Sequence, residues 1–154
     1  METLDALAAI VGPNNCLRGA QDLVPYSNDW FGKFSGTPLA AVRPGSVAEV
    51  SFVLRECARA GLGVVPAGGR TGLCGAAVPA QNGPPSIVLS LERLNRIREV
   101  DARDFSIVAE AGCIIQQVQE AAAAVERLLP PSLGVRVGAQ VAGPRSVHTA
   151  DVAE

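Results

Sequence analysis

The segment PAGGRTGLCGAAVP, residues 66–79, constrains the fold more than any other stretch of the sequence. Four of the eight residues 68–75 are glycines, they lie between two apolar segments, and Arg70 is the only charged side chain among them. Glycine loses more conformational freedom on folding than any other residue, so such a cluster needs a backbone reason. A tight turn, a positive φ or close approach of the main chain to a ligand would each supply one. We therefore expect a loop of defined backbone shape here.

Two common phosphate-binding loops are excluded by the residues at the end of the glycine cluster. A Walker loop ends in Gly-Lys-Ser/Thr, because the lysine reaches the phosphates and the hydroxyl holds magnesium, whereas this loop ends in Gly75-Ala76-Ala77. A Rossmann fingerprint has the spacing G-x-G-x-x-G and opens directly into a helix. Here the spacing is GG-x-x-G-x-x-G, and the loop leads into a proline-rich stretch.

Two interpretations of the loop remain open on the pattern alone. Its glycines and Thr71 could turn several consecutive amides toward one anion, which is the nest geometry that binds phosphate, and Arg70 could add positive charge. Alternatively, the loop could be a plain glycine-rich connector between two strands.

The composition indicates one ordinary domain that does not bind nucleic acid. A chain of 154 residues with 48% hydrophobic residues can bury a sizeable core. Aromatic residues make up only 4% and the net charge is -2, whereas binding to a phosphate backbone requires clustered lysine and arginine.

Metal, disulfide and membrane roles are not predicted. The four cysteines, at positions 16, 57, 74 and 113, form no CxxC pair, and the single histidine, His148, completes no zinc set with them. The N-terminus METLDALAAI carries acidic residues where a secretory signal needs basic ones, and no uncharged apolar run reaches the roughly 18 residues of a membrane span. We therefore expect reduced thiols and a cytoplasmic, soluble chain.

Hydrophobic spacing and breaker residues predict three helices and five strands. Helices are expected over 3–11, 47–60 and about 113–128, and strands over 39–42, 63–66, 86–91, 96–101 and 105–109. No regular structure is expected over 14–37, and no convincing period is present from residue 134 onward.

The helix over 47–60 has the clearest local signals. Ser46 and Glu49 fit a capping box, in which the serine accepts a hydrogen bond from an N3 amide and the glutamate reaches back to the N-cap. Its apolar face is expected to carry four residues at helical spacing: Val50, Val53, Leu54 and Cys57. Gly61 stands where a left-handed cap would end the helix.

The order of motifs along the chain resembles the flavin-binding domain of the vanillyl-alcohol oxidase and para-cresol methylhydroxylase (PCMH-type) family. These motifs are RPGSVAEV, GLGVVPAGGRTGLCGAAVP, IVLSLERLNRI, IVAEAG and PSLG, and the resemblance spans Tyr26 to Gly143. Within the family, YSNDWFGKFSG, GGRTGLCG, EAGCI and LPPSLG look most like the D-2-hydroxy-acid dehydrogenases, such as D-2-hydroxyglutarate dehydrogenase and the glycolate oxidase flavin subunit.

The resemblance implies an α+β fold with FAD held between two subdomains, a small α/β subdomain and part of a second, β-rich one. In such proteins the glycine loop cradles the FAD pyrophosphate, and a later segment passes near the flavin. Carried over by position, the cofactor-binding residues are Pro66, Ala67, Gly68, Gly69, Arg70, Thr71, Gly72, Leu73 and Gly75 in the loop, and Pro130, Ser132, Leu133 and Gly134 in the later segment. FAD is expected to be noncovalent, because the loop offers no histidine for attachment.

The sequence departs from the family pattern after PSLG. Val137-Gly138 replaces a Gly-Ser pair, and Ala142-Gly143-Pro144 replaces Gly-Gly-Asn. We therefore expect residues 1–143 to be the N-terminal part of the FAD-binding domain, incomplete at its C-terminus, and 144–154 to be a divergent tail.

The resemblance implies, for the full-length form, oxidation of a small D-2-hydroxy acid of the 2-hydroxyglutarate, lactate or glycolate type by hydride transfer to the flavin. No catalytic residue is identified, and the chain alone is expected to be incomplete as an enzyme. The competing interpretation is a truncated, noncatalytic remnant that binds a nucleotide or a partner.

Two aromatic residues before the first strand also allow two interpretations. Tyr26 and Trp30 could form a surface for the isoalloxazine, but aromatics in a loop-rich segment more often anchor that segment to the core, and we favour the core role.

Overall fold

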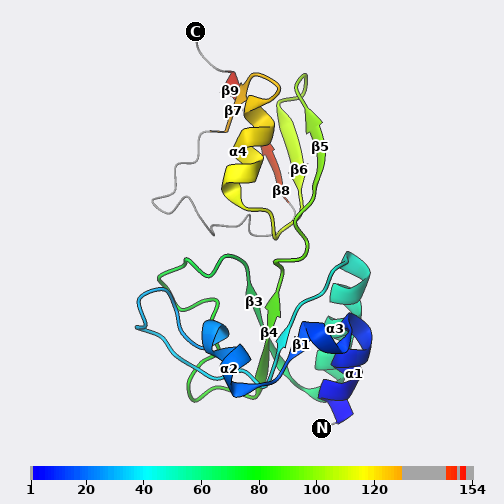
Figure 1. Cartoon of the computed structure of the whole chain (residues 1–154), viewed down its shortest axis with the longest axis vertical. Helices are drawn as coiled ribbons and strands as arrows, with labels where there is room; N and C mark the ends of the chain where they lie inside the picture. The colour runs from blue at the N-terminus through cyan, green and yellow to red at the C-terminus, as the bar shows by residue number, and fades with distance from the viewer. Residues whose placement is uncertain (1, 130–144, 149, 152–154) are drawn as a thin grey trace. The chain divides into compact units, whose positions relative to one another are not determined.

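The structure is a computed structural model that describes residues 2–129, 145–148 and 150–151. The chain divides into two compact units, Met1–Arg93 (unit 1) and Leu94–Glu154 (unit 2). Figure 1 shows both units and labels the α-helices and most of the strands.

Unit 1 is built on a four-stranded sheet with the strand order β1-β2-β4-β3. Strand β4 (Ser86–Ser90) lies between β2 (Ala41–Val42) and β3 (Gly63–Ala67) and is parallel to both. All five residues of β4 are buried, which is the pattern expected of a central strand covered on both faces. The strands expected over 39–42, 63–66 and 86–91 are therefore confirmed.

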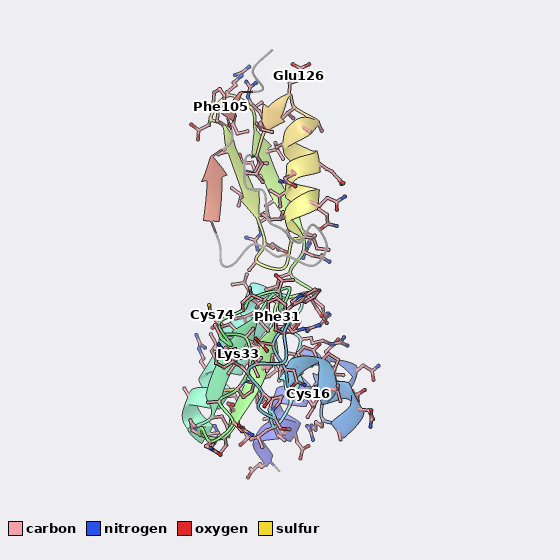
Figure 2. All side chains as sticks on the ribbon, turned by 90° about the vertical axis from the view of Figure 1, so that its left-hand side faces the viewer. Cys16, Phe31, Lys33, Cys74, Phe105 and Glu126 are labelled. Carbon is pink, nitrogen blue, oxygen red and sulfur yellow. The ribbon has the colours of Figure 1, made fainter. Side chains whose placement is uncertain are left out.

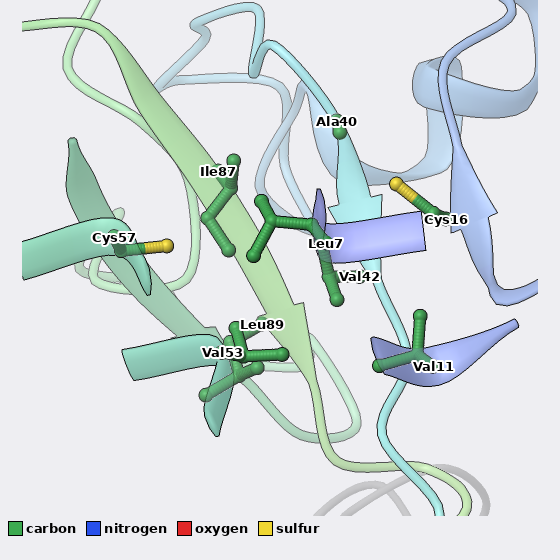
Figure 3. Packing of buried hydrophobic residues seen from close by; sticks show 9 residues of the cluster. All are labelled: Leu7, Val11, Cys16, Ala40, Val42, Val53, Cys57, Ile87 and Leu89. Carbon is green, nitrogen blue, oxygen red and sulfur yellow. The ribbon is translucent and has the colours of Figure 1, made fainter. Parts of the chain in front are cut away.

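The main core of unit 1 lies between this sheet and two helices, α1 (Glu2–Val11) and α3 (Val47–Ala60). Figure 3 shows how the buried side chains meet there. They are Leu7, Val11, Cys16, Ala40, Val42, Val53, Cys57, Ile87 and Leu89. Both helices match the sequence prediction, although Leu54 of α3 is 43% exposed and is not part of this core.

The start of α3 differs slightly from an ideal capping box. Ser46 Oγ accepts a hydrogen bond from the Glu49 amide at 3.1 Å, as predicted. The Glu49 carboxylate reaches one residue further back than expected and accepts from the Gly45 amide at 2.8 Å. Gly61 ends the helix in the left-handed conformation, with φ 65°.

The segment 14–37, for which no regular structure was predicted, contains several short elements, and that prediction is wrong. They are η1 (Pro13–Asn15), β1 (Cys16–Leu17), α2 (Ala20–Leu23) and η2 (Val24–Tyr26). Cys16 is only 6% exposed and pairs with Val42 in the antiparallel β1–β2 ladder. Buried backbone N–H and C=O groups need hydrogen-bond partners. For β1 these partners lie in β2, which is distant in sequence.

Unit 2 pairs strands with one helix. Strands β5 (Ile97–Asp101) and β6 (Ser106–Ala109) form the predicted antiparallel pair. Asp101 Oδ1 accepts hydrogen bonds from the amides of Asp104 and Arg103 in the turn, and these bonds lower the pKa of Asp101. Helix α4 (Ile115–Ala123) packs on this pair through the buried side chains of Ile107, Val118 and Ala122.

Helix α4 is shorter than the predicted 113–128. It ends at Ala123, Glu126 has a positive φ of 58°, and Arg127–Leu128 forms strand β7 instead of a last helical turn. Pairing of β7 with β9 (Ala150–Asp151) competes with helix formation there. Strand β8 (Arg145–His148) pairs with β6, so the stretch expected to be a tail contains backbone strands.

Candidate functional site

The glycine loop begins where two parallel strands of unit 1 end side by side. Ala67, the last residue of β3, is paired in register with Ser90, the last residue of β4. The loop then runs without a helix or strand until β4 begins at Ser86. Ligands of open α/β sheets bind outside the carboxyl ends of parallel strands, so this is a favourable place for a binding loop.

Two glycines of the loop have different structural demands. Gly75 has φ 69°, and a Cβ built on it would lie 2.6 Å from Phe34 Cγ, so the fold itself requires glycine there. At Gly72 a Cβ would meet no described atom within 4 Å. The fold of the described residues therefore does not explain Gly72, whereas close approach of a ligand to the backbone would.

Arg70 is held in a fixed position within the loop. Its backbone has a positive φ of 53°, and its guanidinium lies 4.4 Å from the centre of the Tyr26 ring, a cation–π contact. Its Nη1 is buried and makes no hydrogen bond within the described part of the chain. A buried donor without a partner costs about 1–3 kcal/mol. An anionic ligand at the loop would satisfy this donor, so the loop suits a diphosphate group such as that of FAD.

The predicted loop residues fall into two groups. Pro66 and Ala67 belong to β3 itself, and Ala67 is only 1% exposed. The others form the loop, in which Gly68, Gly69, Arg70, Thr71 and Gly75 are half-buried and Gly72 and Leu73 are exposed. Figure 2 labels Cys74 of this loop and Phe31 of the segment 27–36. The second predicted group, Pro130, Ser132, Leu133 and Gly134, lies outside the described residues.

Two polar residues beside the loop were missed by the sequence analysis. Ser90 is fully buried at the end of β4, and its Oγ makes no hydrogen bond to the rest of the described structure. Asp29 is 8% exposed, and its Oδ2 also has no hydrogen-bond partner there. A serine inside the apolar run SIVLSL was a detectable signal, whereas nothing local marks Asp29 as buried.

Tyr26 and Trp30 lie in different environments in the structure. Tyr26 is 4% exposed and packs with Leu23, Ala41, Ala67 and Val88, which confirms its core role. Trp30 is 57% exposed, so the prediction that it anchors its segment to the core is wrong.

The cysteines and the potential metal ligands of the described residues form no further binding or catalytic site beside the glycine loop. Cys74 is an exposed thiol, whereas Cys57 and Cys113 are buried, and burial raises the pKa of both thiols. No group of three or more histidine, cysteine, aspartate or glutamate residues in the described part of the chain could hold a metal ion. Among the described helices, none combines the length and the apolar character that crossing a membrane requires.

The sequence of this chain matches the profile of the FAD binding domain family over residues 38–147. The chain belongs to this family. The matched range includes β2, α3, β3, the whole glycine loop and β4 in unit 1, together with most of unit 2. The FAD-binding class that the sequence motifs implied is therefore confirmed.

Curated relatives of this FAD binding domain include D-2-hydroxyglutarate dehydrogenases. The protein of that name from Xanthomonas citri pv. viticola is 40% identical over 122 residues, which cover 79% of this chain and 25% of the relative. The one from Stutzerimonas stutzeri is 36% identical over 117 residues, covering 76% of this chain and 25% of the relative. The chain thus spans about a quarter of the length of the curated relatives it matches.

Solved structures with the same fold include p-cresol methylhydroxylase with substrate bound. It aligns with a TM-score of 0.76 and 23% identity, over 92% of this chain and 27% of that chain. An alkyldihydroxyacetonephosphate synthase aligns with a TM-score of 0.80 and 17% identity, over 91% of this chain and 28% of that one. These likenesses confirm the predicted α+β, PCMH-type fold of the FAD binding domain.

Proposed function

We propose that the chain binds FAD through the glycine loop, residues 68–75, as the cofactor-binding part of an oxidoreductase that acts on a D-2-hydroxy acid. The observation that carries the FAD-binding role is Arg70, whose buried Nη1 lacks a partner among the described residues, within a loop at the carboxyl end of β3. The substrate class is supported by relatives that are named D-2-hydroxyglutarate dehydrogenase. The proposed substrates are D-2-hydroxy acids of the 2-hydroxyglutarate, lactate or glycolate type.

Each part of the loop has a role in this proposal. Backbone amides of residues 68–75 donate hydrogen bonds to the diphosphate, in the manner of an anion-binding nest. Gly72 lets the main chain approach the ligand, because no described atom lies near the position of its missing Cβ. Arg70 adds a positive charge, which the contact with Tyr26 holds in place. Pro130, Ser132, Leu133 and Gly134 remain proposed contacts of the flavin end.

Bound FAD supplies an acceptor for the hydride that leaves the α-carbon of the hydroxy acid. The chain's own residues are proposed to bind and orient the cofactor. Noncovalent binding is part of the proposal, because residues 66–79 contain no histidine to which the flavin could be attached.

The cytoplasmic location stays a prediction. Several relatives, including those from Oryza sativa subsp. indica and Arabidopsis thaliana, are named as mitochondrial proteins.

Titration of the purified chain with FAD tests the proposal, with flavin fluorescence as the readout. Gly72→Val should weaken FAD binding about tenfold or more, because side-chain atoms would hold the diphosphate away from the backbone amides. The unfolding midpoint should stay near that of the wild type, since the structure leaves space at Gly72. Ala76→Val, an exposed position at the exit of the same loop, is the matched control and should bind FAD like the wild type.

The result separates the two classes of function. Equal FAD affinity of the wild type and Gly72→Val would contradict the proposed role of the loop. A folded, colourless wild-type chain that binds no FAD would favour the noncatalytic remnant. Loss of the yellow colour of the FAD-loaded chain on addition of a D-2-hydroxy acid would support the oxidoreductase class.

A further inference from the structure

One loop of unit 1 carries three exposed aromatic side chains that are close together in the sequence. Trp30, Phe31 and Phe34 are 57%, 74% and 40% exposed. We call residues 30–34, WFGKF, the aromatic tip. The chain contains four phenylalanines, one tyrosine and one tryptophan, so half of its aromatic residues lie within these five positions. Exposed apolar side chains that gather at one place mark an interaction surface, whereas single scattered ones do not.

The backbone on both sides of the aromatic tip is held by hydrogen bonds. An antiparallel bridge joins Asn28 to Ser35, so the loop closes as a small hairpin. At the turn, Gly32 has φ 68°, and its amide donates to the Asp29 carbonyl at 3.0 Å. The exposed rings therefore have a defined arrangement, which the hairpin sets.

The exposed charge beside the rings is positive. Lys33, the only lysine of the chain, lies within the aromatic tip, and its Nζ is 5.5 Å from the centre of the Phe34 ring. Asp29, the one acidic residue of the segment 27–36, is 8% exposed and accepts from the Phe34 amide through Oδ1. Figure 2 labels Phe31 and Lys33 on the side of unit 1 that faces the viewer. The exposed side chains of this segment thus include aromatic rings and a cation but no anion.

This combination matches the surface of a lipid bilayer better than it matches a protein partner. Aromatic rings are favoured at the level of the lipid headgroups, and a lysine stem lies along apolar surface while its charge stays near water. Stable protein interfaces bury about 20–30 residues on each side and are depleted of lysine. The aromatic tip has five residues, and one of them is the lysine.

We propose that the aromatic tip is a docking surface for an anionic lipid bilayer. Trp30, Phe31 and Phe34 enter the headgroup region, and Lys33 lies near the lipid phosphates. The tip rests in the interface without crossing the bilayer, and a loop of this size gives weak, reversible binding. The inference does not depend on FAD binding, because the tip contains no residue of the glycine loop.

The fluorescence of Trp30 reports contact between the tip and lipid, because Trp30 is the only tryptophan of the chain. The purified chain is mixed with vesicles of phosphatidylcholine alone, or of phosphatidylcholine with phosphatidylglycerol. With the mixed vesicles the chain should co-sediment, the emission should shift to the blue, and brominated lipids should quench it. Affinity for phosphatidylcholine alone should be about fivefold lower, since one lysine gains about that factor at an anionic surface. High salt should remove this difference by screening.

Two variants separate the contribution of the rings from that of the charge. Phe31→Ala should weaken binding to the mixed vesicles about tenfold, because burying one phenylalanine side chain is worth a factor of at least that order. Lys33→Gln should bind both kinds of vesicle equally. Phe52→Ala is the matched control, because Phe52 is 53% exposed and lies next to Arg55, but on α3. It should bind like the wild type, and thermal unfolding of each variant checks that the fold is retained.

Three results would overturn the inference. The first is a wild-type chain that neither co-sediments nor shifts its emission with either kind of vesicle. The second is equal affinity of Phe31→Ala and Phe52→Ala for the mixed vesicles. The third is a blue shift that grows with protein concentration without lipid, which would show that a second copy of the chain covers the tip. None of these measurements contains FAD, so the proposed function is tested separately.

Discussion

Replacing Gly75 by alanine should destabilise unit 1 strongly, whereas the same change at Gly72 should not. Gly75 has φ 69°, a conformation that costs an alanine about 1–2 kcal/mol. The new Cβ would also lie 2.6 Å from Phe34 Cγ and 2.9 Å from Phe34 Cβ, well inside the contact distance of about 3.5–4.0 Å between carbon atoms.

The collision cannot be relieved by turning the Phe34 ring alone. The Phe34 Cβ moves only with its backbone, and that backbone is held on both sides by Asp29. The Phe34 amide donates to Asp29 Oδ1 at 3.0 Å, and the Phe34 carbonyl accepts from the Asp29 amide at 3.0 Å. Forced overpacking of this kind typically costs about 1–3 kcal/mol. Together, the overpacking and the left-handed backbone conformation of the alanine should lower the unfolding free energy by about 2–5 kcal/mol.

Urea denaturation followed by far-ultraviolet circular dichroism measures this loss. With a slope of about 1–3 kcal/mol per molar urea, the midpoint of Gly75→Ala should fall by roughly 1 M or more. Gly72→Ala should lie within about 1 kcal/mol of the wild type, since glycine-to-alanine changes without strain are neutral or mildly stabilising. Equal midpoints for the two variants would refute the reasoning.

Two further changes test other parts of the fold. Ser46→Ala should lower the unfolding free energy by about 0.5–2 kcal/mol through loss of the cap on α3, and an unchanged denaturation midpoint would contradict this. In unit 2, burial opposes ionisation of Glu110, but hydrogen bonds from the Arg96 amide and the Arg98 guanidinium outweigh it, so the pKa of Glu110 lies below its ordinary value. The resulting stability is present above the ordinary pKa of about 4.5 and is lost as the pH falls through the lowered value. Glu110→Gln should therefore be less stable than the wild type at neutral pH by about 1 kcal/mol, and the difference should shrink in acid, as pH-dependent thermal unfolding would show.

The parts of the fold that the sequence predicted are those whose signals are local. Helix α3 begins and ends at the predicted residues because Ser46 and Gly61 act on the backbone within one turn. The antiparallel pair β5–β6 follows from two apolar runs and the short turn between them. In both cases the residues that decide the structure are neighbours in the chain.

The parts that were missed depend on distant partners. Strand β1 has only two residues and exists through its pairing with β2, so no local period predicts it. The alanine run 121–124 favours a helix that continues, but the chain leaves the helix at Ala124 and pairs as β7. The glycine loop was predicted from its composition, whereas burial of Asp29 and Ser90 beside it is set by tertiary packing.

The left-handed backbone of Arg70 limits which reasons can account for an arginine at this position. With φ 53°, glycine would be the residue of lowest conformational energy, and the loop already uses glycine at four of its eight positions. The substitution Arg70→Gly would relieve the backbone and remove only the side chain. The arginine is therefore present for what its guanidinium does, despite its backbone cost, and related sequences should exchange it for residues that keep a hydrogen-bond donor more readily than for apolar ones.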